Sequence, residues 1–145
     1  MISVDRISAR IRRQVQGRAK GFCEYCRTPD NFATSSFHCE HIIPQKTGGT
    51  NSLDNLAWAC PRCNNHKHAK THAQDPQTGQ RVPLFNPRLK NWNRHFMWSE
   101  DLLLILGRTR TGRATAEALN MNLPQRINLR RALLSLGEHP AQISL

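Results

Sequence analysis

The sequence predicts a small α+β protein in which two strands and a helix are held together by paired cysteines. The spacing Cys-x-x-Cys occurs twice, as Cys23/Cys26 and as Cys60/Cys63, and 33 residues separate the two pairs. The segments between and after the pairs are, in chain order, a strand over residues 37–43, a polar loop over 44–54, a strand over 55–59 and a helix over 64–72. This order predicts a ββα core at about residues 21–72.

Prolines and glycines mark the ends of these elements. Pro44 ends the first strand, because proline has no N–H to donate to a ladder and disfavours a helical residue before it. Gly48 and Gly49 favour a turn within the polar loop. Gly21 opens the turn of the first cysteine pair, and Pro61 sets the turn of the second.

Further elements are predicted on both sides of this core. Ile7, Ile11 and Val15 recur at four-residue spacing and indicate a helix over about residues 4–18. The C-terminal extension, about residues 73–145, contains a turn at 75–79, candidate strands at 82–85 and 95–98, and candidate helices at 112–120 and 124–137. The length of 145 residues suits one domain with a modest core, so we expect a single domain over residues 1–145.

The two cysteine pairs have the spacing of metal ligands. Each pair lets two thiolates reach one ion from a single turn, and four thiolates form a closed tetrahedral zinc site with no open position. Such a site is structural and would join the strands to the helix. An iron–sulfur cluster and a redox pair are the alternatives. Cys39 stands outside both pairs, and we expect it to behave as a small buried hydrophobe.

The charge of the chain favours a polyanionic partner. The formal net charge is +11 and the pI is near 10.5. Residues 1–20 contain six Lys/Arg and one Asp, and residues 71–145 contain ten Lys/Arg and five acidic residues, whereas the segment between them is nearly balanced. Arg10 and Arg13 of the predicted N-terminal helix are candidate phosphate contacts. A basic surface kept for solubility is the alternative interpretation.

The sequence contains no apolar segment long enough to span a membrane. The longest apolar run, at residues 102–106, is far shorter than the roughly 18 residues that a span requires. The N-terminal segment MISVDRISARIRRQV lacks a hydrophobic signal core, so we expect a cytoplasmic protein with no membrane partner. In a reducing cytosol, paired cysteines are more often metal ligands than disulfides.

Polar residues with the chemistry of a metal-assisted hydrolase lie between the cysteine pairs and just after them: Glu40, His41, Asn55 and Asn64. The segment that contains them resembles the HNH endonucleases, the ββα-metal nuclease family. The resemblance rests on CEYC, EHIIP, TGG, DNL and CPRCNNHK, within about residues 21–70. Asn64 stands where many members of the family carry a histidine, so the chain is similar to an H-N-N variant.

The resemblance implies a role for each of these residues. Glu40 and Asn64 would hold a hard divalent ion, Mg²⁺ or Mn²⁺, through oxygen atoms. His41 would be the general base, since an imidazole with its ordinary pKa of about 6.5 is mostly neutral at slightly alkaline pH and can accept a proton from water. Asn55 would tie the long loop to the hairpin and so orient the histidine.

Three neighbouring side chains are further candidates for this site. Lys67 lies three residues after Asn64, on the same helical face, and could hold a phosphate. His68 lies four residues after Asn64 and could be a third metal ligand or a phosphate contact. His38, on the strand face of Glu40, is a similar candidate. For both histidines a solvent-facing or structural side chain is the alternative.

These observations predict a metal-dependent endonuclease that cleaves or nicks DNA and contains a structural zinc, with RNA as a possible substrate. The rival interpretation is a non-catalytic, zinc-dependent module that binds nucleic acid on the same scaffold. A zinc-stapled domain for protein interactions is a third possibility, but the charge fits it poorly. The presence together of Glu40, His41, Asn55 and Asn64 favours the enzyme, because a binding module does not need them.

Overall fold

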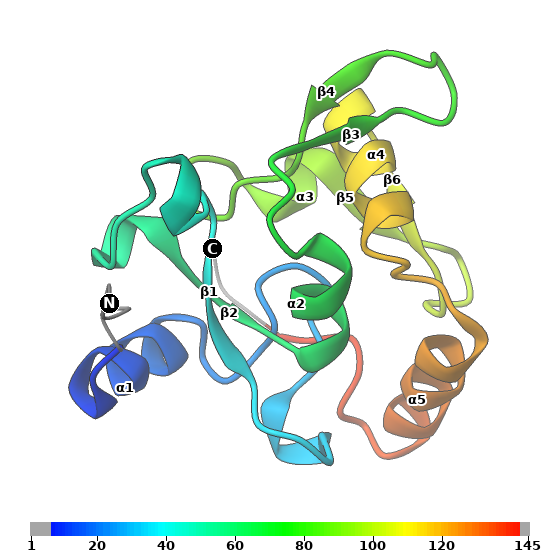
Figure 1. Ribbon diagram of the computed structural model, residues 1–145. Helices are drawn as coiled ribbons and strands as arrows, with labels where there is room; N and C mark the ends of the chain where they lie inside the picture. The colour runs from blue at the N-terminus through cyan, green and yellow to red at the C-terminus, as the bar shows by residue number, and fades with distance from the viewer. Residues whose placement is uncertain (1–6, 143–145) are drawn as a thin grey trace.

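The computed structural model describes residues 7–142 and combines helices with small antiparallel sheets (Figure 1). The predicted α+β fold class is confirmed. The helices are α1 (Ala9–Arg18), α2 (Pro61–Lys67), α3 (Trp92–His95), α4 (Arg110–Ala118) and α5 (Pro124–Ser135). The strands form three two-stranded sheets: β1 (His38–His41) with β2 (Leu56–Ala59), β3 (His72–Gln74) with β4 (Arg81–Pro83), and β5 (Phe96–Trp98) with β6 (Ile105–Gly107).

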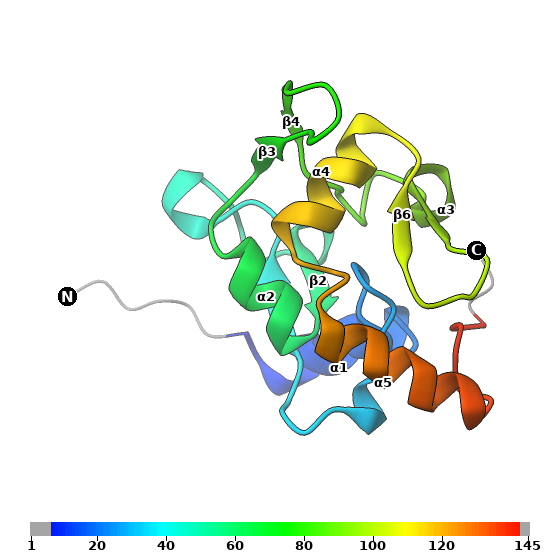
Figure 2. The ribbon, with the colours of Figure 1, turned by 90° about the vertical axis from the view of Figure 1, so that its right-hand side faces the viewer.

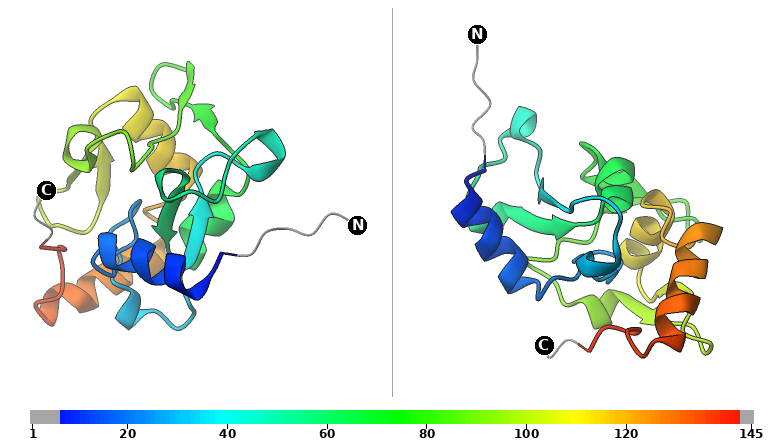
Figure 3. Two further views of the ribbon diagram at one scale, coloured as in Figure 1. Left: turned by 90° about the vertical axis from the view of Figure 1, so that its left-hand side faces the viewer. Right: turned by 90° about the horizontal axis from the view of Figure 1, so that it is seen from below.

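The hairpin β1–β2 and helix α2 form a ββα unit. In the hairpin register, Glu40 lies opposite Ala57 and His41 lies opposite Leu56. The connecting loop contains two short 3₁₀ turns, η2 (Gln45–Thr47) and η3 (Leu53–Asn55). Helix α1 packs against β2 and helix α2 against β1, and the two helices lie on opposite sides of the hairpin (Figure 3). Glu40 and His41 therefore lie next to each other on β1, in a hairpin that has a helix packed on each side.

The two strands of the hairpin are shorter than the sequence predicts. The predicted strand over 37–43 begins at His38, and it ends at His41. After His41 the backbone is bonded by Asn55, whose side chain accepts from the N–H of Ile43 and donates to its carbonyl. The predicted second strand over 55–59 begins at Leu56, because Asn55 closes η3 instead.

Helix α2 is displaced toward the N-terminus relative to the predicted helix over 64–72. It begins at Pro61, because Cys60 is the N-cap and its Sγ accepts from the N–H of Cys63 at 3.3 Å. Proline in the first turn suits this start, since the N–H it lacks would have no intrahelical partner there. The helix ends at Lys67, and His68 leaves it with a φ of +50°. Residues 72–74 form β3 instead of a last helical turn.

Helix α1 starts at Ala9, where Ser8 is the N-cap and accepts from the N–H of Ile11 at 3.1 Å. The first part of the predicted helix over 4–18, residues 4–6, lies outside the described residues. Val15 is fully buried on the face toward the hairpin. Two of the arginines bind carbonyl groups of the protein: Arg12 donates to Phe37 O at 2.8 Å, and Arg18 donates to Leu53 O and Leu56 O.

The C-terminal extension contains two hairpins and two longer helices (Figure 2). The predicted strands at 82–85 and 95–98 correspond to β4 and β5, and the predicted helices at 112–120 and 124–137 correspond to α4 and α5. Strands β3 and β6 were not predicted. Asp75, fully buried in the turn after β3, accepts two bonds of 2.9 Å from Arg113 of α4. These bonds hold the pKa of Asp75 well below its ordinary value.

Aromatic side chains join the extension to the cysteine-bearing part. Trp92 of α3 is 4% exposed and donates from Nε1 to Tyr25 O at 2.8 Å. Phe85 and Phe96 meet edge to face, with ring centroids 5.2 Å apart, and Phe85 also meets Tyr25 at 6.5 Å. These residues share one buried cluster with the four paired cysteines. No helix in the described part of the chain is long and apolar enough to cross a membrane.

Candidate functional site

The four paired cysteines meet at one point between the first turn and α2. The Sγ atoms of Cys23, Cys26, Cys60 and Cys63 all lie within 4.8 Å of one another, and all four residues are buried. The Sγ atoms of Cys26 and Cys60 are 3.6 Å apart. A tetrahedral ion with Zn–S bonds of about 2.3 Å separates its sulfur ligands by roughly 3.8 Å. The soft donor set and its spacing therefore fit a structural zinc ion.

A buried arginine of the extension contacts this cluster. Arg126, in the first turn of α5, donates from Nη2 to Cys63 Sγ at 3.0 Å and lies 3.6 Å from Cys60 Sγ. Its Nη1 donates to the carbonyls of Leu119 and Asn120. Four thiolates around a divalent ion carry a net negative charge, and the guanidinium would offset part of it. No local pattern predicts this contact, because 63 residues separate Arg126 from Cys63.

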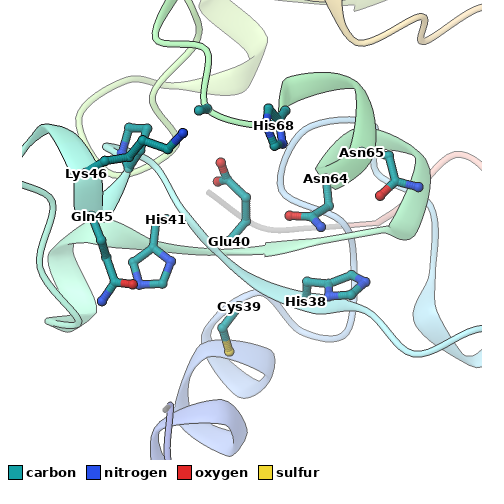
Figure 4. A pocket seen from close by; sticks show the side chains of 11 residues that line it. His38, Cys39, Glu40, His41, Gln45, Lys46, Asn64, Asn65 and His68 are labelled. Atoms are coloured by element: carbon teal, nitrogen blue, oxygen red, sulfur yellow. The ribbon is translucent and has the colours of Figure 1, made fainter. Parts of the chain in front are cut away.

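A pocket beside the metal centre brings together most of the predicted polar residues (Figure 4). Its walls come from β1, from the loop after β1 and from α2. Glu40, His41, Asn64 and His68 line it together, and so does His38. Of the predicted residues, Asn55 and Lys67 do not line it. We call this hollow the catalytic pocket.

Glu40 is held in place by two buried partners. It is 4% exposed; its Oε2 accepts from the hydroxyl of Tyr25 at 2.8 Å, and its Oε1 forms an ion pair with Lys67. Burial raises the pKa of Glu40, while the charge and hydrogen bond of Lys67 and the hydroxyl of Tyr25 partly offset this effect. An ionised carboxylate offers about four lone-pair positions, so both partners leave room for a metal ion.

The structure places Lys67 differently from the phosphate contact that we expected. The side chain is almost fully buried, and Nζ donates to Ile42 O at 2.9 Å and to His41 O at 3.3 Å besides pairing with Glu40. The last turn of α2 faces β1, so the long side chain extends into the interior and not along the pocket wall. Lys67 is thus an internal counterion of Glu40.

His41 points away from Glu40 and toward the loop (Figure 4). The ring is half-buried, and its Nε2 lies 2.6 Å from Oδ1 of Asn51. The same oxygen accepts from Nε2 of Gln45 at 3.1 Å. Because this oxygen is an acceptor, the bond assigns the ring proton to Nε2 and leaves the lone pair on Nδ1. Asn51 was not singled out by the sequence, where it is one of several polar residues in the loop.

Asn55 fastens the loop on which Asn51 lies. Its Nδ2 donates to Thr50 O at 2.8 Å and to Ile43 O at 3.0 Å, so it has the geometry that the expected tie between loop and hairpin requires. Gly49 permits the close approach, since a Cβ at this position would lie 1.7 Å from Ile43 O. Asn55 therefore bonds the start of the loop to the residue that precedes Asn51.

The α2 side of the pocket is formed by Asn64 and His68. Asn64 is half-buried and His68 is exposed. The two residues are four positions apart at the end of the helix, and both line the pocket. His68 adopts φ +50°, a region that side-chain-bearing residues seldom occupy. Among the described residues, the four cysteines are the one group of three or more His, Cys, Asp or Glu side chains close enough to hold a metal. A second ion would therefore depend on Glu40 together with a carboxamide or imidazole of α2.

Comparison with known families agrees with this geometry. Residues 23–70 match the family model described as HNH endonuclease, which confirms the family that the sequence resembles. The matched segment begins at the first cysteine of the metal centre and contains the hairpin, the loop and α2. Proteins of this family act on nucleic acid. No curated protein matches the chain.

Replacing Lys67 with methionine is expected to destabilise the protein. Removing one partner of a buried ion pair typically costs about 3–5 kcal/mol, because the remaining charge stays buried. Loss of the ammonium raises the pKa of Glu40 further, so the folded state retains a proton that the unfolded state releases. The loss of stability should then grow as the pH rises above the ordinary carboxyl range. Urea unfolding of Lys67→Met and wild type at pH 5 and pH 8 measures it.

The double variant Lys67→Met/Glu40→Gln is the control for this experiment. It removes both charges, so it should recover much of the stability and lose the pH dependence. A Lys67→Met protein that unfolds like wild type at both pH values would show that the ion pair is unimportant.

Proposed function

We propose that the protein is a metal-dependent endonuclease that hydrolyses phosphodiester bonds of DNA. The observation that carries the proposal is the lining of one pocket by Glu40, His41 and Asn64 within the segment that matches the HNH endonucleases. A carboxylate, an imidazole and a carboxamide supply metal ligands and a base for phosphodiester hydrolysis. We further propose that residues 1–145 form a single domain, with the extension packed on the core.

Glu40 and Asn64 would hold Mg²⁺ or Mn²⁺. A bound ion of this kind would neutralise the charge that develops on the phosphate and on the leaving oxygen. His68 is a possible third ligand from the same pocket. Oxygen donors suit hard ions of this kind. With few protein ligands, water and the scissile phosphate would have access to the pocket.

His41 would take a proton from the attacking water at Nδ1. The bond between Nε2 and Asn51 supports this assignment, since it leaves Nδ1 as the basic nitrogen. Asn55 would hold the loop that carries Asn51, and so would fix the ring indirectly. Lys67 would keep Glu40 ionised when no divalent ion is bound.

The alternative function is a zinc-dependent module that binds nucleic acid without cleaving it. The two functions are separated by a nicking assay with purified protein and supercoiled plasmid, with and without Mg²⁺ or Mn²⁺. We expect the relaxed circle to accumulate only when a divalent ion is added. Binding of DNA without nicking under any divalent metal would favour the binding module.

Asn51→Ala is expected to slow nicking by about 10- to 100-fold, because the imidazole loses the acceptor that fixes its orientation. The rate at saturating DNA should fall while DNA affinity stays near wild type. Asn51→Asp keeps an acceptor oxygen at this position and should retain more activity than Asn51→Ala. Equal rates for wild type and Asn51→Ala would remove the asparagine from the catalytic arrangement.

Binding to DNA is expected to depend steeply on salt, because a chain of net charge +11 releases counterions from the phosphates it contacts. Arg10 and Arg13 are exposed on α1 and are the contacts we propose there. Each lost contact reduces the log–log slope of affinity against salt by about 0.9. Fluorescence anisotropy of Arg10→Gln/Arg13→Gln should show this reduction, and an unchanged slope would place the contacts elsewhere.

A further inference from the structure

A second hollow of the surface is strongly basic and shares no lining residue with the catalytic pocket. It lies between the end of α1, the turn of the first cysteine pair and the segment that leads into α3. We call it the basic pocket. Its charged lining consists of five cationic side chains and one carboxylate: Arg18, Lys20, Arg27, Arg88, Lys90 and Glu24.

The single carboxylate is already used within the protein. Glu24 is 7% exposed; its Oε1 pairs with Arg88 and its Oε2 accepts from the N–H of Trp58 at 2.8 Å. The remaining four cations therefore have no carboxylate among the pocket's own residues. Burial lowers the pKa of Arg18, and the positive charge of Arg88 lowers it further. The cations of the basic pocket thus outnumber its one carboxylate, which is already paired with Arg88.

One donor in this lining is left without an acceptor. Nη1 of Arg88 is buried and has no hydrogen-bond partner among the described residues, although Nη2 of the same group is paired. Buried polar atoms are nearly always satisfied, so an orphan guanidinium nitrogen indicates a missing acceptor. A ligand with anionic oxygen atoms would supply it.

Two of the cations lie at positions where the backbone φ is positive. Lys20 has a φ of +55° and Arg27 a φ of +66°, where glycine or asparagine would be favoured. Both residues line the basic pocket. The guanidinium of Arg27 also lies over the ring of Trp92, with Cζ 5.1 Å from the ring centroid. Stacking on a buried ring restricts the orientation of the group before any ligand arrives.

We propose that the basic pocket binds a backbone phosphate of the nucleic acid, at a point separate from the phosphate that is cleaved. The inference rests on the proposed function for the nature of the partner. A phosphate presents several anionic oxygen atoms, which match guanidinium and ammonium donors that converge from different segments.

A neighbouring hollow adjoins the basic pocket and extends to the loop after β1. It shares Arg18, Arg88 and Leu89 with the basic pocket, and it is lined by Ile43 and by residues 48–50 of the loop after β1. Pro44, Gln45 and Lys46 of the same loop line the catalytic pocket. A strand of nucleic acid that leaves the catalytic pocket over this loop would pass toward the basic pocket.

The test compares two variants of equal charge. Lys20→Gln/Lys90→Gln removes two exposed cations from the basic pocket, and Arg110→Gln/Arg131→Gln removes two exposed cations from α4 and α5, outside both pockets. Affinity for a short DNA duplex is measured against salt concentration without added divalent ion. The log–log slope should fall by about 0.9 in the first variant, for the one phosphate that the basic pocket binds, and stay near wild type in the second. Melting temperatures verify that both variants fold.

A titration with inorganic phosphate examines the pocket independently of DNA. In NMR spectra, the backbone amides of Lys20, Arg27 and Trp92 should shift in wild type, and these shifts should be lost in Lys20→Gln/Lys90→Gln. Equal slopes for the two variants would overturn the proposal. Phosphate shifts without an effect on DNA affinity would also overturn it, because the pocket would then serve free phosphate. Neither result bears on nicking by the wild-type protein, which tests the proposed function separately.

Discussion

His41→Ala is expected to lower the rate of DNA nicking by about 10²–10⁴-fold while DNA affinity and melting temperature change little. General-base catalysis typically contributes this factor, and the substitution removes the nitrogen that would accept the proton. The ring is half-buried at the edge of the hairpin, and its Nε2 is bonded to Oδ1 of the loop residue Asn51. The change leaves Glu40, Asn64 and the metal centre intact. Single-turnover nicking of supercoiled plasmid measures the rate.

Variants of the two proposed metal ligands, Glu40 and Asn64, are the controls. Glu40→Ala and Asn64→Ala should also lose activity, but by weakening a divalent ion, so that extra Mn²⁺ restores part of it. The same addition should not restore His41→Ala, because the missing group is a base. Equal nicking by His41→Ala and wild type would move the active centre to another part of the molecule.

The features that the sequence predicts are those encoded by residues close together in the chain. A Cys-x-x-Cys turn needs only four residues, so the two pairs could be recognised directly, and Pro44 marked the end of a strand. Helix and strand limits were less accurate where one side chain decides them. Cys60 caps α2, which starts three residues before the expected position, and Asn55 ends a 3₁₀ turn where a strand was expected. The spacing of apolar residues does not reveal that a cysteine caps a helix, so the start of α2 was placed too late.

The parts of the site that sequence could not predict depend on contacts between distant segments. Lys67 shares a helical spacing with Asn64, which suggested a common wall of the pocket. The orientation of α2 against β1 decides otherwise and directs the ammonium to Glu40. Tyr25 contacts Glu40 from the turn of the first cysteine pair, and Asn51 contacts His41 from the loop after β1. Spacing identifies residues with suitable chemistry, and packing determines which of them touch.

The largest effect on stability is expected from Cys60→Ser. The binding energy of a structural zinc site, about 10–16 kcal/mol in small zinc domains, is largely folding energy. This is as large as the whole stability of a typical domain, about 5–15 kcal/mol. Cys60 both belongs to the buried cluster and caps α2, so its loss removes a ligand and the start of the helix together. We expect a protein without bound zinc that is unfolded or melts far below wild type.

Cys39→Ser is the matched control, because Cys39 is a half-buried cysteine of β1 outside the cluster. It should keep about one zinc per chain and a melting temperature near wild type. Arg126→Met should keep the four thiolates but lose the donor to Cys63, so a chelator should remove its zinc faster than from wild type. Metal analysis and thermal unfolding of Cys60→Ser, Cys39→Ser and Arg126→Met test whether the cysteine cluster holds a structural zinc. Metal-free wild type that melts at the temperature of the metal-bound protein would contradict a structural role, since the fold would then need no ion between its cysteines.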